Sequence, residues 1–347
     1  MEGHIDSDYG KMGMGVIRYL QNPIIGIIDK SHAGKKMNEL FQFSGPIPIY
    51  ESLQQVEDKE IEVLILGIAP SGGKIPDSWV SVIDEALEMG LSIINGLHDL
   101  LQPQWQHKIK FPKKQWIWDV RVPQFTPPIA SGKAAKLNNK RVLFVGTDMA
   151  IGKMTAALEL YQWLINENQN VGFVATGQIG ITITGQGIPL DAFKVDHACG
   201  AVEKAVMEQS KKNIVLIEGQ GSLLHPGSTA TLPLMRGSSP THLILCHGAH
   251  KTHLRSPKEV AVPDLKSFIM LHENLCSVIG TYPEAKVVGI ALNTSDLTDS
   301  SSKATIAQME DEIKLPVQDV VRFGAEKLAS QLTVSYTHLR AHETLLY

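Results

Sequence analysis

The sequence has few cysteines, little net charge and no long apolar run. Its three cysteines, Cys199, Cys246 and Cys276, form no CxxC pair, so we expect neither a disulfide framework nor a paired-cysteine zinc or redox site. The formal net charge of -4 argues against a dedicated binder of nucleic acids. No apolar run approaches the roughly 18 residues that span a bilayer, and nothing reads as a signal peptide. We therefore expect a cytoplasmic protein without nucleic-acid or membrane partners.

The composition is that of a globular protein with room for two domains. Apolar residues make up 43% of the 347 residues and charged residues 20%, which argues against global disorder. A chain of this length exceeds one minimal domain and can bury sizeable cores.

The end of the sequence reads as something other than natural protein. Residues 334–344 spell VSYTHLRAHET, a string that looks like a translated transposase sequencing adapter. We therefore set residues 334–347 apart as adapter read-through and exclude them from fold reasoning. His338, His342 and Glu343 fall in this segment, so we assign them no metal-binding role, and we predict no metal site elsewhere.

Eight short apolar runs recur along the chain, most of them ending in Gly, Asp or Asn. Continuous runs rich in β-branched residues are typical of strands buried on both faces of a parallel sheet. Helix-like stretches with apolar residues three and four apart lie between them, as in 77–90 and 153–168. The pattern predicts a doubly wound α/β fold, although any single run can instead be a buried helix segment. The runs are PIIGIID (23–29), EVLILGIAP (62–70), LSIINGLHD (91–99), RVLFVGTD (141–148), NVGFVATG (170–177), NIVLIEGQG (213–221), HLILCHG (242–248) and VVGIALN (287–293).

A change in composition predicts a domain boundary. Residues 121–140 are rich in Pro, Ser, Gly and Lys and lack periodicity, which is typical of a linker. We predict an N-terminal domain over 1–125, a linker over 126–140 and a C-terminal domain over 141–333.

Residues 141–160, RVLFVGTDMAIGKMTAALEL, contain the most informative motif. A strand leads into a glycine-containing loop that ends in Gly-Lys at the start of an amphipathic helix. Such a loop directs successive N–H groups inward, where the helix N-terminus and the lysine add positive potential for a phosphate. The alternative, a structural turn beside a surface lysine, does not account for Gly-Lys at this junction. The predicted cofactor-binding residues here are Gly146, Thr147, Asp148, Gly152, Lys153, Met154 and Thr155.

The spacing of this loop departs from the usual one. Five residues separate Gly146 from Gly152, one more than in most phosphate loops. Met154 occupies the position where Ser or Thr usually binds Mg²⁺. This favours a pyrophosphate held by N–H groups and lysine without metal, although Thr155 could still reach a metal ion.

The loop resembles that of dethiobiotin synthetase, which likewise opens with Gly-Thr-Asp and closes with Gly-Lys. The string Glu218-Gly219-Gln220-Gly221 resembles that enzyme's acidic residue at a strand end, followed by glycines. The resemblance implies that Glu218 binds Mg²⁺ or substrate, where the alternative is a solvated charge. It also places Asn293 where such folds often read a nucleotide base, where the alternative is a turn-forming Asn.

Longer strings resemble a single two-domain family, the DgcN-type D-glutamate N-acetyltransferases, often labelled NAD-dependent epimerase/dehydratase. The resemblance implies a Rossmann-like N-terminal half, a P-loop C-terminal half, an acetyl-CoA donor and a D-amino acid acceptor. His197 and the pair His250-Lys251 depart from the family pattern, which puts the acceptor in doubt. The matching strings are IIDKSHAGK (27–35), GIAPSGG (67–73), GLHD (96–99), DVRVP (119–123), GTDMAIGKMT (146–155), TGQIG (176–180), EGQGSLLHPG (218–227), LCHGAHKTHLR (245–255) and VRFGAEKLA (321–329).

Acetylation of an amine requires a held pyrophosphate, a neutral amine and a stabilised oxyanion. His225 and His253, just past strand ends, are the predicted bases, with Glu218 as a further catalytic residue. Arginines can clamp substrate carboxylates, although surface arginines are common. Cys199 and Cys246 could relay an acyl group, but small buried hydrophobes are the simpler interpretation. The predicted substrate residues are Arg236, Arg255, Gln178 and Gln220.

The N-terminal half lacks a G-x-G-x-x-G fingerprint, so the sequence provides little support for NAD. Several of its residues could instead form one face of a cleft between the domains, although the adjacent glycines can equally make a turn. These residues are Asp29, His32, Gly72, Gly73, His98, Asp99 and Arg121.

The sequence thus predicts an N-acetyltransferase that uses acetyl-CoA and a small amino acid and forms a homo-oligomer. Two alternatives stay open. One is an ATP-dependent ligase or phosphotransferase that needs Mg²⁺, and the other is a nucleotide-sensing module without turnover.

Overall fold

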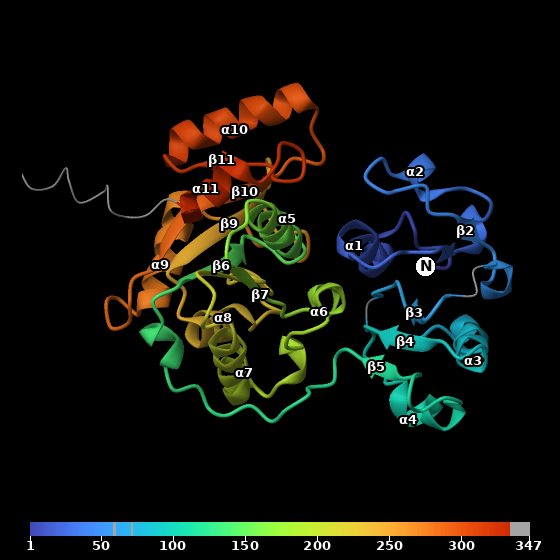
Figure 1. Ribbon diagram of the computed structural model, residues 1–347. Coiled ribbons are helices and arrows are strands. Elements are labelled where there is room, and N and C mark those ends of the chain that lie inside the picture. Colours follow the sequence, from blue (N-terminus) through green and yellow to red (C-terminus); the bar gives the residue numbers. More distant parts are fainter. Residues whose placement is uncertain (58–59, 71, 334–347) are drawn as a thin grey trace, which may run out of the picture. The chain divides into compact units, whose positions relative to one another are not determined.

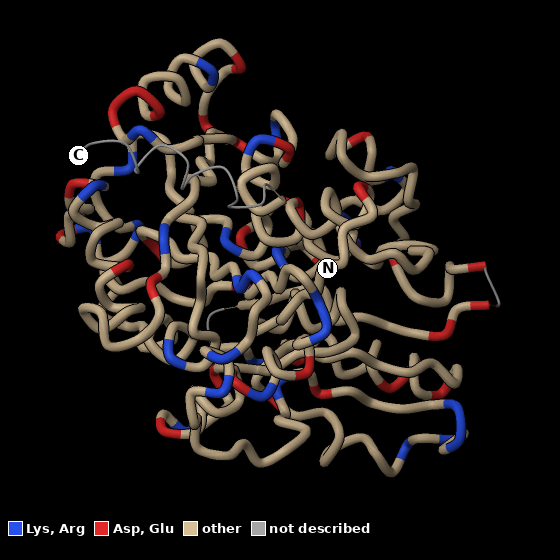
Figure 2. Tube along the Cα trace, turned by 60° about the vertical axis from the view of Figure 1, so that its left-hand side comes forward, with Lys and Arg blue, Asp and Glu red and all other residues tan. Residues whose placement is uncertain are grey.

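The computed structural model describes residues 1–57, 60–70 and 72–333 (Figure 1). The adapter-like segment 334–347 lies outside the described residues. The chain divides into two compact units. Unit 1 comprises Met1–Thr126 and Gly177–Ala192, and unit 2 comprises Pro127–Thr176 and the chain from Phe193 onward. Figure 2 shows basic and acidic residues interspersed along both units.

Unit 2 is built on one parallel sheet of six strands in the order β11-β10-β9-β6-β8-β7. The chain places β7 and β8 on one side of β6 and the remaining strands on the other, so the strand order reverses at β6. In open α/β sheets, ligands bind outside the carboxyl ends of the strands at such a point. The strands are β6 (Lys140–Gly146), β7 (Val171–Val174), β8 (Ile214–Ile217), β9 (His242–Gly248), β10 (Lys286–Asn293) and β11 (Val317–Gln318).

Helices pack against this sheet in two groups. One group pairs α5 with α11, and the other places α7 beside α8 and α8 beside α9. The strands β6, β7, β8 and β9 are buried almost throughout, which explains why their sequences are continuously apolar. The helices are α5 (Lys153–Asn166), α7 (Val195–Glu208), α8 (Thr231–Ser238), α9 (Leu265–Ser277), α10 (Asp299–Ile313) and α11 (Glu326–Thr333).

The segment expected to be a linker is fixed to unit 2. The carboxylate of Glu203 accepts hydrogen bonds from Ser131 N–H at 2.9 Å and Lys133 N–H at 2.7 Å. Arg141, which is 1% exposed, donates to the carbonyl oxygens of Leu137 and Asn139. These contacts give the segment defined partners that its composition did not indicate.

Unit 1 contains two small parallel sheets, β1-β2 and β3-β4-β5. The helix α6 (Gln178–Thr184), far away in sequence, groups with unit 1 and contacts α1. The strands are β1 (Ile27–Ile28), β2 (Ile49–Tyr50), β3 (Val63–Ile65), β4 (Ser92–Asn95) and β5 (Ile117–Asp119). The other helices are α1 (Lys11–Tyr19), α2 (Met37–Leu40), α3 (Val80–Glu88) and α4 (Gln102–Trp105).

The predicted α/β fold with parallel sheets is confirmed, and each of the eight apolar runs contains a strand. The run 23–29 contains only the two-residue strand β1. The sequence analysis missed β2, β5 and β11, each of which has two or three residues and therefore little periodicity. Within the described part of the chain, no helix is both long enough and apolar enough to span a bilayer.

Candidate phosphate-binding site

The loop between β6 and α5 has the backbone geometry of a phosphate cradle. β6 ends at Gly146, and α5 begins at Lys153 after Gly152, whose φ of 106° suits a residue without a side chain. A Cβ on Gly146 would lie 2.9 Å from Ile151 and 3.3 Å from the Lys153 Nζ, so the loop closes tightly over the strand end. The first N–H groups of α5 have no partner within the helix and add positive potential at this point.

Lys153 is a buried ammonium with one hydrogen bond. Its side chain folds back so that Nζ donates to the main-chain oxygen of Asp148 at 2.7 Å. Among the described residues it forms no ion pair, although it is only 6% exposed. Burial lowers its pKa from 10.5 to about 8, an effect that the nearby Cys246, Asp148 and Glu218 only partly oppose. Two of its three donors are thus available to an anion.

Asp148 joins the loop to the segment that follows β9. One carboxylate oxygen accepts from Met149 N–H at 2.7 Å, and the other accepts from Arg255 N–H at 2.8 Å. The latter oxygen also lies 3.0 Å from Lys251 Nζ. Burial alone would raise the pKa of Asp148, but these three partners together hold it below its usual value. Asp148 is therefore ionised, and its carboxylate holds the loop against the segment that follows β9.

Glu218 follows β8 and lies beside Lys153. Its carboxylate accepts from Thr176 N–H at 2.8 Å and from Gln220 Nε2 at 3.2 Å, and it is 2% exposed. The next residue, Gly219, presses against β6, because a Cβ there would lie 1.7 Å from the oxygen of Phe144. The string Glu218-Gly219 thus brings a carboxylate to the phosphate loop, and only glycine permits this approach.

A pocket of about 390 Å³ adjoins the phosphate loop. Gly152 and Thr155 line it on one side, and Asn293 lines it at the end of β10. The exposed Asn293 accepts from Ser295 N–H at 3.0 Å through Oδ1, which leaves its amide N–H groups without a partner among the described residues. The structure therefore brings Asn293 and the loop together in one concave site. β6 and β10 are parallel and lie on either side of β9, so their carboxyl ends meet at the same edge of the sheet.

The two predicted bases have different surroundings. His225 is half-buried and accepts from Gly227 N–H at 3.1 Å through Nδ1, so its neutral form carries the proton on Nε2. His253 is exposed, and its Nδ1 lies 3.1 Å from the hydroxyl of Thr252. It stands two residues from Arg255, whose N–H is bonded to Asp148. His253 is thus the residue with an open ring nitrogen on a segment anchored to the phosphate loop.

The sequence analysis missed His247, the sixth residue of β9. Its Nδ1 lies 2.9 Å from the hydroxyl of Thr147, and the side chain is 5% exposed. Burial and Lys251 lower its pKa from 6.5 to about 4, so it is neutral at physiological pH. In the sequence, the indication of this buried residue is a histidine inside an apolar run.

The four predicted substrate residues belong to different elements, three in unit 2 and Gln178 in unit 1. Arg236 on α8 donates to the oxygen of Leu275 at 2.9 Å near the end of α9 and stacks on Tyr282, as a helix cap does. Arg255 is exposed, and Gln220 bonds Glu218. Gln178 opens α6 in unit 1, where it lies against Gly96. Arg255 therefore adjoins the loop through its N–H bond to Asp148, and Gln220 adjoins it through its bond to Glu218.

Neither candidate acyl-relay cysteine has an activated thiol. Burial raises the pKa of Cys246 to about 12, although the positive charge of Lys153 opposes this shift. Burial also raises the pKa of Cys199 above its usual value. A nucleophilic cysteine needs a lowered pKa, so both thiols fit the simpler interpretation of small hydrophobes.

The chemistry-bearing residues of unit 1 follow its strands at their carboxyl ends. Asp29 is fully buried after β1, and its Oδ1 lies 3.0 Å from His32 Nδ1. After β4, His98 N–H donates to Gly73 O at 2.7 Å. After β5, the Arg121 guanidinium donates to Gly96 O at 2.8 Å and contacts Asp191. The two remaining predicted residues lie nearby: Gly72 adjoins Gly73 with a φ of 82°, and Asp99 accepts from Ile75 N–H at 2.9 Å.

No group of three His, Cys, Asp or Glu suited to a metal occurs among the described residues of either unit.

Two family models match the chain. Residues 30–123 match a Rossmann-like domain of unknown function, DUF1611_N, and residues 128–329 match a P-loop domain of unknown function, DUF1611_C. The predicted combination of a Rossmann-like N-terminal half with a P-loop C-terminal half is confirmed.

Similar proteins span most of the chain. A D-glutamate N-acetyltransferase of Tritonibacter scottomollicae is 36% identical over 283 residues, covering 81% of this chain and 84% of that protein. Another of Pseudoalteromonas sp is 34% identical over 274 residues, covering 78% and 81%. The crystal structure of a DUF1611 protein from Anabaena variabilis ATCC 29413 superposes with a TM-score of 0.90 at 43% identity, covering 95% of this chain and 97% of that one.

Proposed function

The chain belongs to the DUF1611 family, and from this premise we propose that it is an N-acetyltransferase that acetylates a D-amino acid. The donor is acetyl-CoA, and the acceptor is of the D-glutamate type. The names of the two relatives at 34% and 36% identity support this choice of reaction.

The observation that carries the proposal is the buried ammonium of Lys153. Within residues 1–57, 60–70 and 72–333 its one hydrogen bond is to a main-chain carbonyl, and burial disfavours its charged form. An anion placed beside Nζ would offset that cost, because a charge-assisted hydrogen bond is roughly twice as strong as a neutral one. The pyrophosphate of CoA is such an anion, and the glycine loop supplies further N–H donors for it. The residues present therefore fit the phosphates of this donor.

The pocket beside the loop supports a donor that contains a nucleotide. Its volume of about 390 Å³ lies in the usual range of small-ligand sites. Asn293 offers free amide N–H groups at one end, and the apolar side chains of Ile151 and Ala156 offer a surface for a flat ring. We propose that this pocket takes the adenine ring.

Acetyl transfer forms an N–C amide bond and breaks the thioester C–S bond, and CoA leaves as the thiol. The amine must lose a proton, and we propose that His253 accepts it, because His253 has an open Nε2 and lies on the segment fastened to Asp148. His225 suits a different role. Since its Nδ1 already accepts a hydrogen bond, its Nε2–H can donate to the oxygen on which negative charge develops. Arg255 is the proposed partner of a substrate carboxylate.

One observation favours a second candidate, an ATP-dependent ligase. The carboxylate of Glu218 at the end of β8 lies beside Lys153, in a place where it could hold Mg²⁺ with ATP. The two candidates differ in what they consume, so a product assay separates them.

The test is an assay of the purified protein with acetyl-CoA and D-glutamate, L-glutamate or other amino acids, in which free CoA thiol and N-acetyl product are measured. We expect product with the D-amino acid and loss of turnover in His253→Gln. Lys258→Gln, at an exposed position of the same segment after β9, is the matched control and should retain activity. Release of ADP from ATP·Mg²⁺ without thiol release would replace the proposal by the ligase, and tight binding without any product would replace it by a sensing module.

A further inference from the structure

The pocket beside the phosphate loop contains a cationic side chain to which the proposed function gives no role. Among the described residues that line this pocket, Arg322 alone is a lysine or an arginine. It follows β11 in the chain, and its side chain is 24% exposed. Asn293 and Thr155 line the same pocket. The guanidinium therefore belongs to the site that holds the proposed contacts of the adenine ring.

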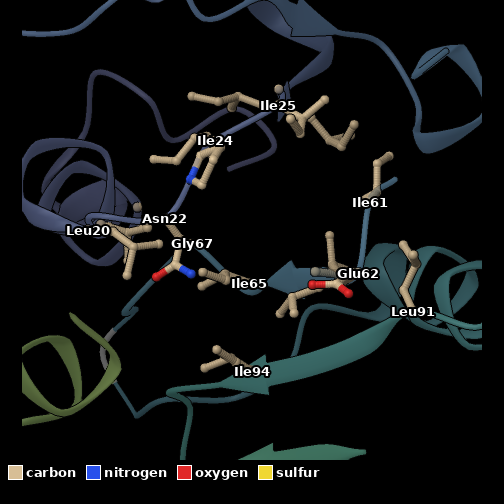
Figure 3. A pocket seen from close by; sticks show the side chains of 18 of the residues that line it. Leu20, Asn22, Ile24, Ile25, Ile61, Glu62, Ile65, Gly67, Leu91 and Ile94 are labelled. Carbon is tan, nitrogen blue, oxygen red and sulfur yellow. The ribbon is translucent and has the colours of Figure 1, made fainter. Parts of the chain in front are cut away.

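A larger cavity, in unit 1, has no such cation. Its volume is about 570 Å³, and Ile24, Ile65 and Ile94 are among the apolar side chains around it (Figure 3). Its charged side chains are those of Glu60 and Glu62, and none of its described lining residues is a lysine or an arginine. Carboxylates repel an anion, so we expect phosphate groups to bind in the pocket of unit 2 and not in this cavity.

The Arg322 guanidinium is held by two contacts. Its Nη1 donates to the carboxylate of Asp299 at 2.5 Å, and its Nη2 donates to the main-chain oxygen of Thr294 at 3.2 Å. A guanidinium has five N–H donors, so three of them have no partner among the described residues. Arg322 is therefore fixed beside the pocket, while most of its N–H groups can still bind a ligand.

The carboxylate in the pocket, Asp319, is bonded to its own loop and is 5% exposed. Its Oδ2 accepts from Thr294 N–H at 3.0 Å and from the Thr294 hydroxyl. Its Oδ1 accepts from the N–H groups of Val321 at 3.1 Å and Arg322 at 3.0 Å. These bonds satisfy the carboxylate and fix the backbone of Arg322, so Asp319 positions the arginine at the pocket.

CoA differs from ATP by a phosphate on the 3′ oxygen of its ribose. The ribose links the adenine to the pyrophosphate, so a donor with its ring at Asn293 and its pyrophosphate at Lys153 carries this phosphate on the sugar between them. The planar fork of an arginine suits a phosphate, because two parallel N–H groups can bond two of its oxygens.

We propose that Arg322 binds the 3′-phosphate of CoA and thereby selects CoA over nucleotides that lack this group. The inference rests on the proposed function, since it takes acetyl-CoA as the donor.

Asp299 competes with the 3′-phosphate for the same guanidinium. It is the first residue of α10, and its side chain is 75% exposed, so it can turn into water when a phosphate takes its place. Neutralising Asp299 should therefore strengthen CoA binding, whereas neutralising Arg322 should weaken it. A merely structural ion pair would give effects of the same sign, because either variant would break it.

The test is calorimetric titration of the full chain with CoA and with 3′-dephospho-CoA, which lacks only this phosphate. We expect the unmodified protein to bind CoA about tenfold more tightly or better, because a hydrogen bond to a charged group is among the strong ones. Arg322→Gln should bring the ratio of the two Kd values near one by weakening CoA alone, and Asp299→Asn should increase the ratio. An unchanged Kd for dephospho-CoA shows that each variant keeps its fold.

Lys303→Gln is the matched control. It removes the same charge from an exposed position of α10 that does not line the pocket, so the ratio should stay as in the unmodified protein. An equal fall of the ratio in Lys303→Gln would overturn the inference, because the effect would then be general electrostatics.

Two further results would overturn the inference and leave the proposed function standing. One is a ratio near one in the unmodified protein with both ligands bound. The other is an unchanged ratio in Arg322→Gln, whether or not both ligands bind more weakly, since the arginine would then act only through the fold of the pocket. Failure of the unmodified protein to bind either ligand would overturn the inference and the proposed function together.

Discussion

The ammonium group of Lys153 lies 2.7 Å from the main-chain oxygen of Asp148, so the phosphate loop closes on its own lysine. The carboxylate of the same aspartate points the other way, to Lys251 and to Arg255 N–H. Asp148 thereby links the loop to the segment that carries His253.

Removing the charge of Lys153 should weaken donor binding and leave the fold intact. In Lys153→Met we expect the Kd for CoA to rise by about one to two orders of magnitude, since a hydrogen bond to a charged group contributes roughly 1.5–3 kcal/mol. Calorimetry measures the change. Lys211→Met, an exposed lysine of unit 2, is the control and should bind CoA normally. Unaltered affinity in Lys153→Met would contradict the phosphate assignment.

The buried lysine should also make stability depend on alkaline pH. Its pKa is 10.5 in the unfolded chain and about 8 in the fold, so the unfolded chain binds more protons between these values. The free energy of unfolding should therefore rise with pH in this window, where the cost of burying the charge is relieved. Urea unfolding of the protein and of Lys153→Met from pH 7.5 to 10.5 checks this. The difference in the free energy of unfolding between the protein and Lys153→Met should become smaller as pH rises. A difference that stays constant over this range would contradict the lowered pKa of Lys153.

Donor binding should survive removal of divalent metals. Met154 stands where Mg²⁺-dependent loops place a hydroxyl, and the loop's N–H groups with Lys153 suffice for a pyrophosphate. We expect the Kd for CoA to be the same in EDTA and in Mg²⁺ within error. A large loss of affinity in EDTA would instead favour the ATP-dependent ligase, with Glu218 or Thr155 as the metal ligand.

Gly219→Ala should disrupt the site through the backbone. The added methyl would lie 1.7 Å from the oxygen of Phe144, so β8 and β6 must separate at the end where the loop begins. We expect a loss of about 1–3 kcal/mol in the free energy of unfolding, as for other overpacked sites, together with weaker CoA binding. Gly45→Ala, where the methyl meets nothing within 4 Å, is the control. Equal stability of the two variants would mean that the contact between the strands is looser than the structure has it.

The sequence alone determined the elements whose signal is local. The apolar runs predicted β6, β8 and β9, because a strand buried on both faces must be apolar at successive positions. The motif from Gly146 to Lys153 predicted the phosphate loop, because glycines and a lysine at a strand-to-helix junction have few other uses. The two-domain family followed from strings long enough to be specific.

Only the tertiary structure decided which distant residues meet. Nothing local relates Asp148 to Lys251, or Thr147 to His247, because these contacts depend on β6 and β9 lying side by side in the sheet. The same holds for Asn293, which reaches the pocket of the loop through β10. Arg236 was a predicted substrate residue, and in the structure it donates to a carbonyl near the end of α9. The helix α6 groups with unit 1. Both arrangements depend on packing between segments far apart in the chain. Strand periodicity identifies the elements, whereas sheet order determines which of their ends form a site.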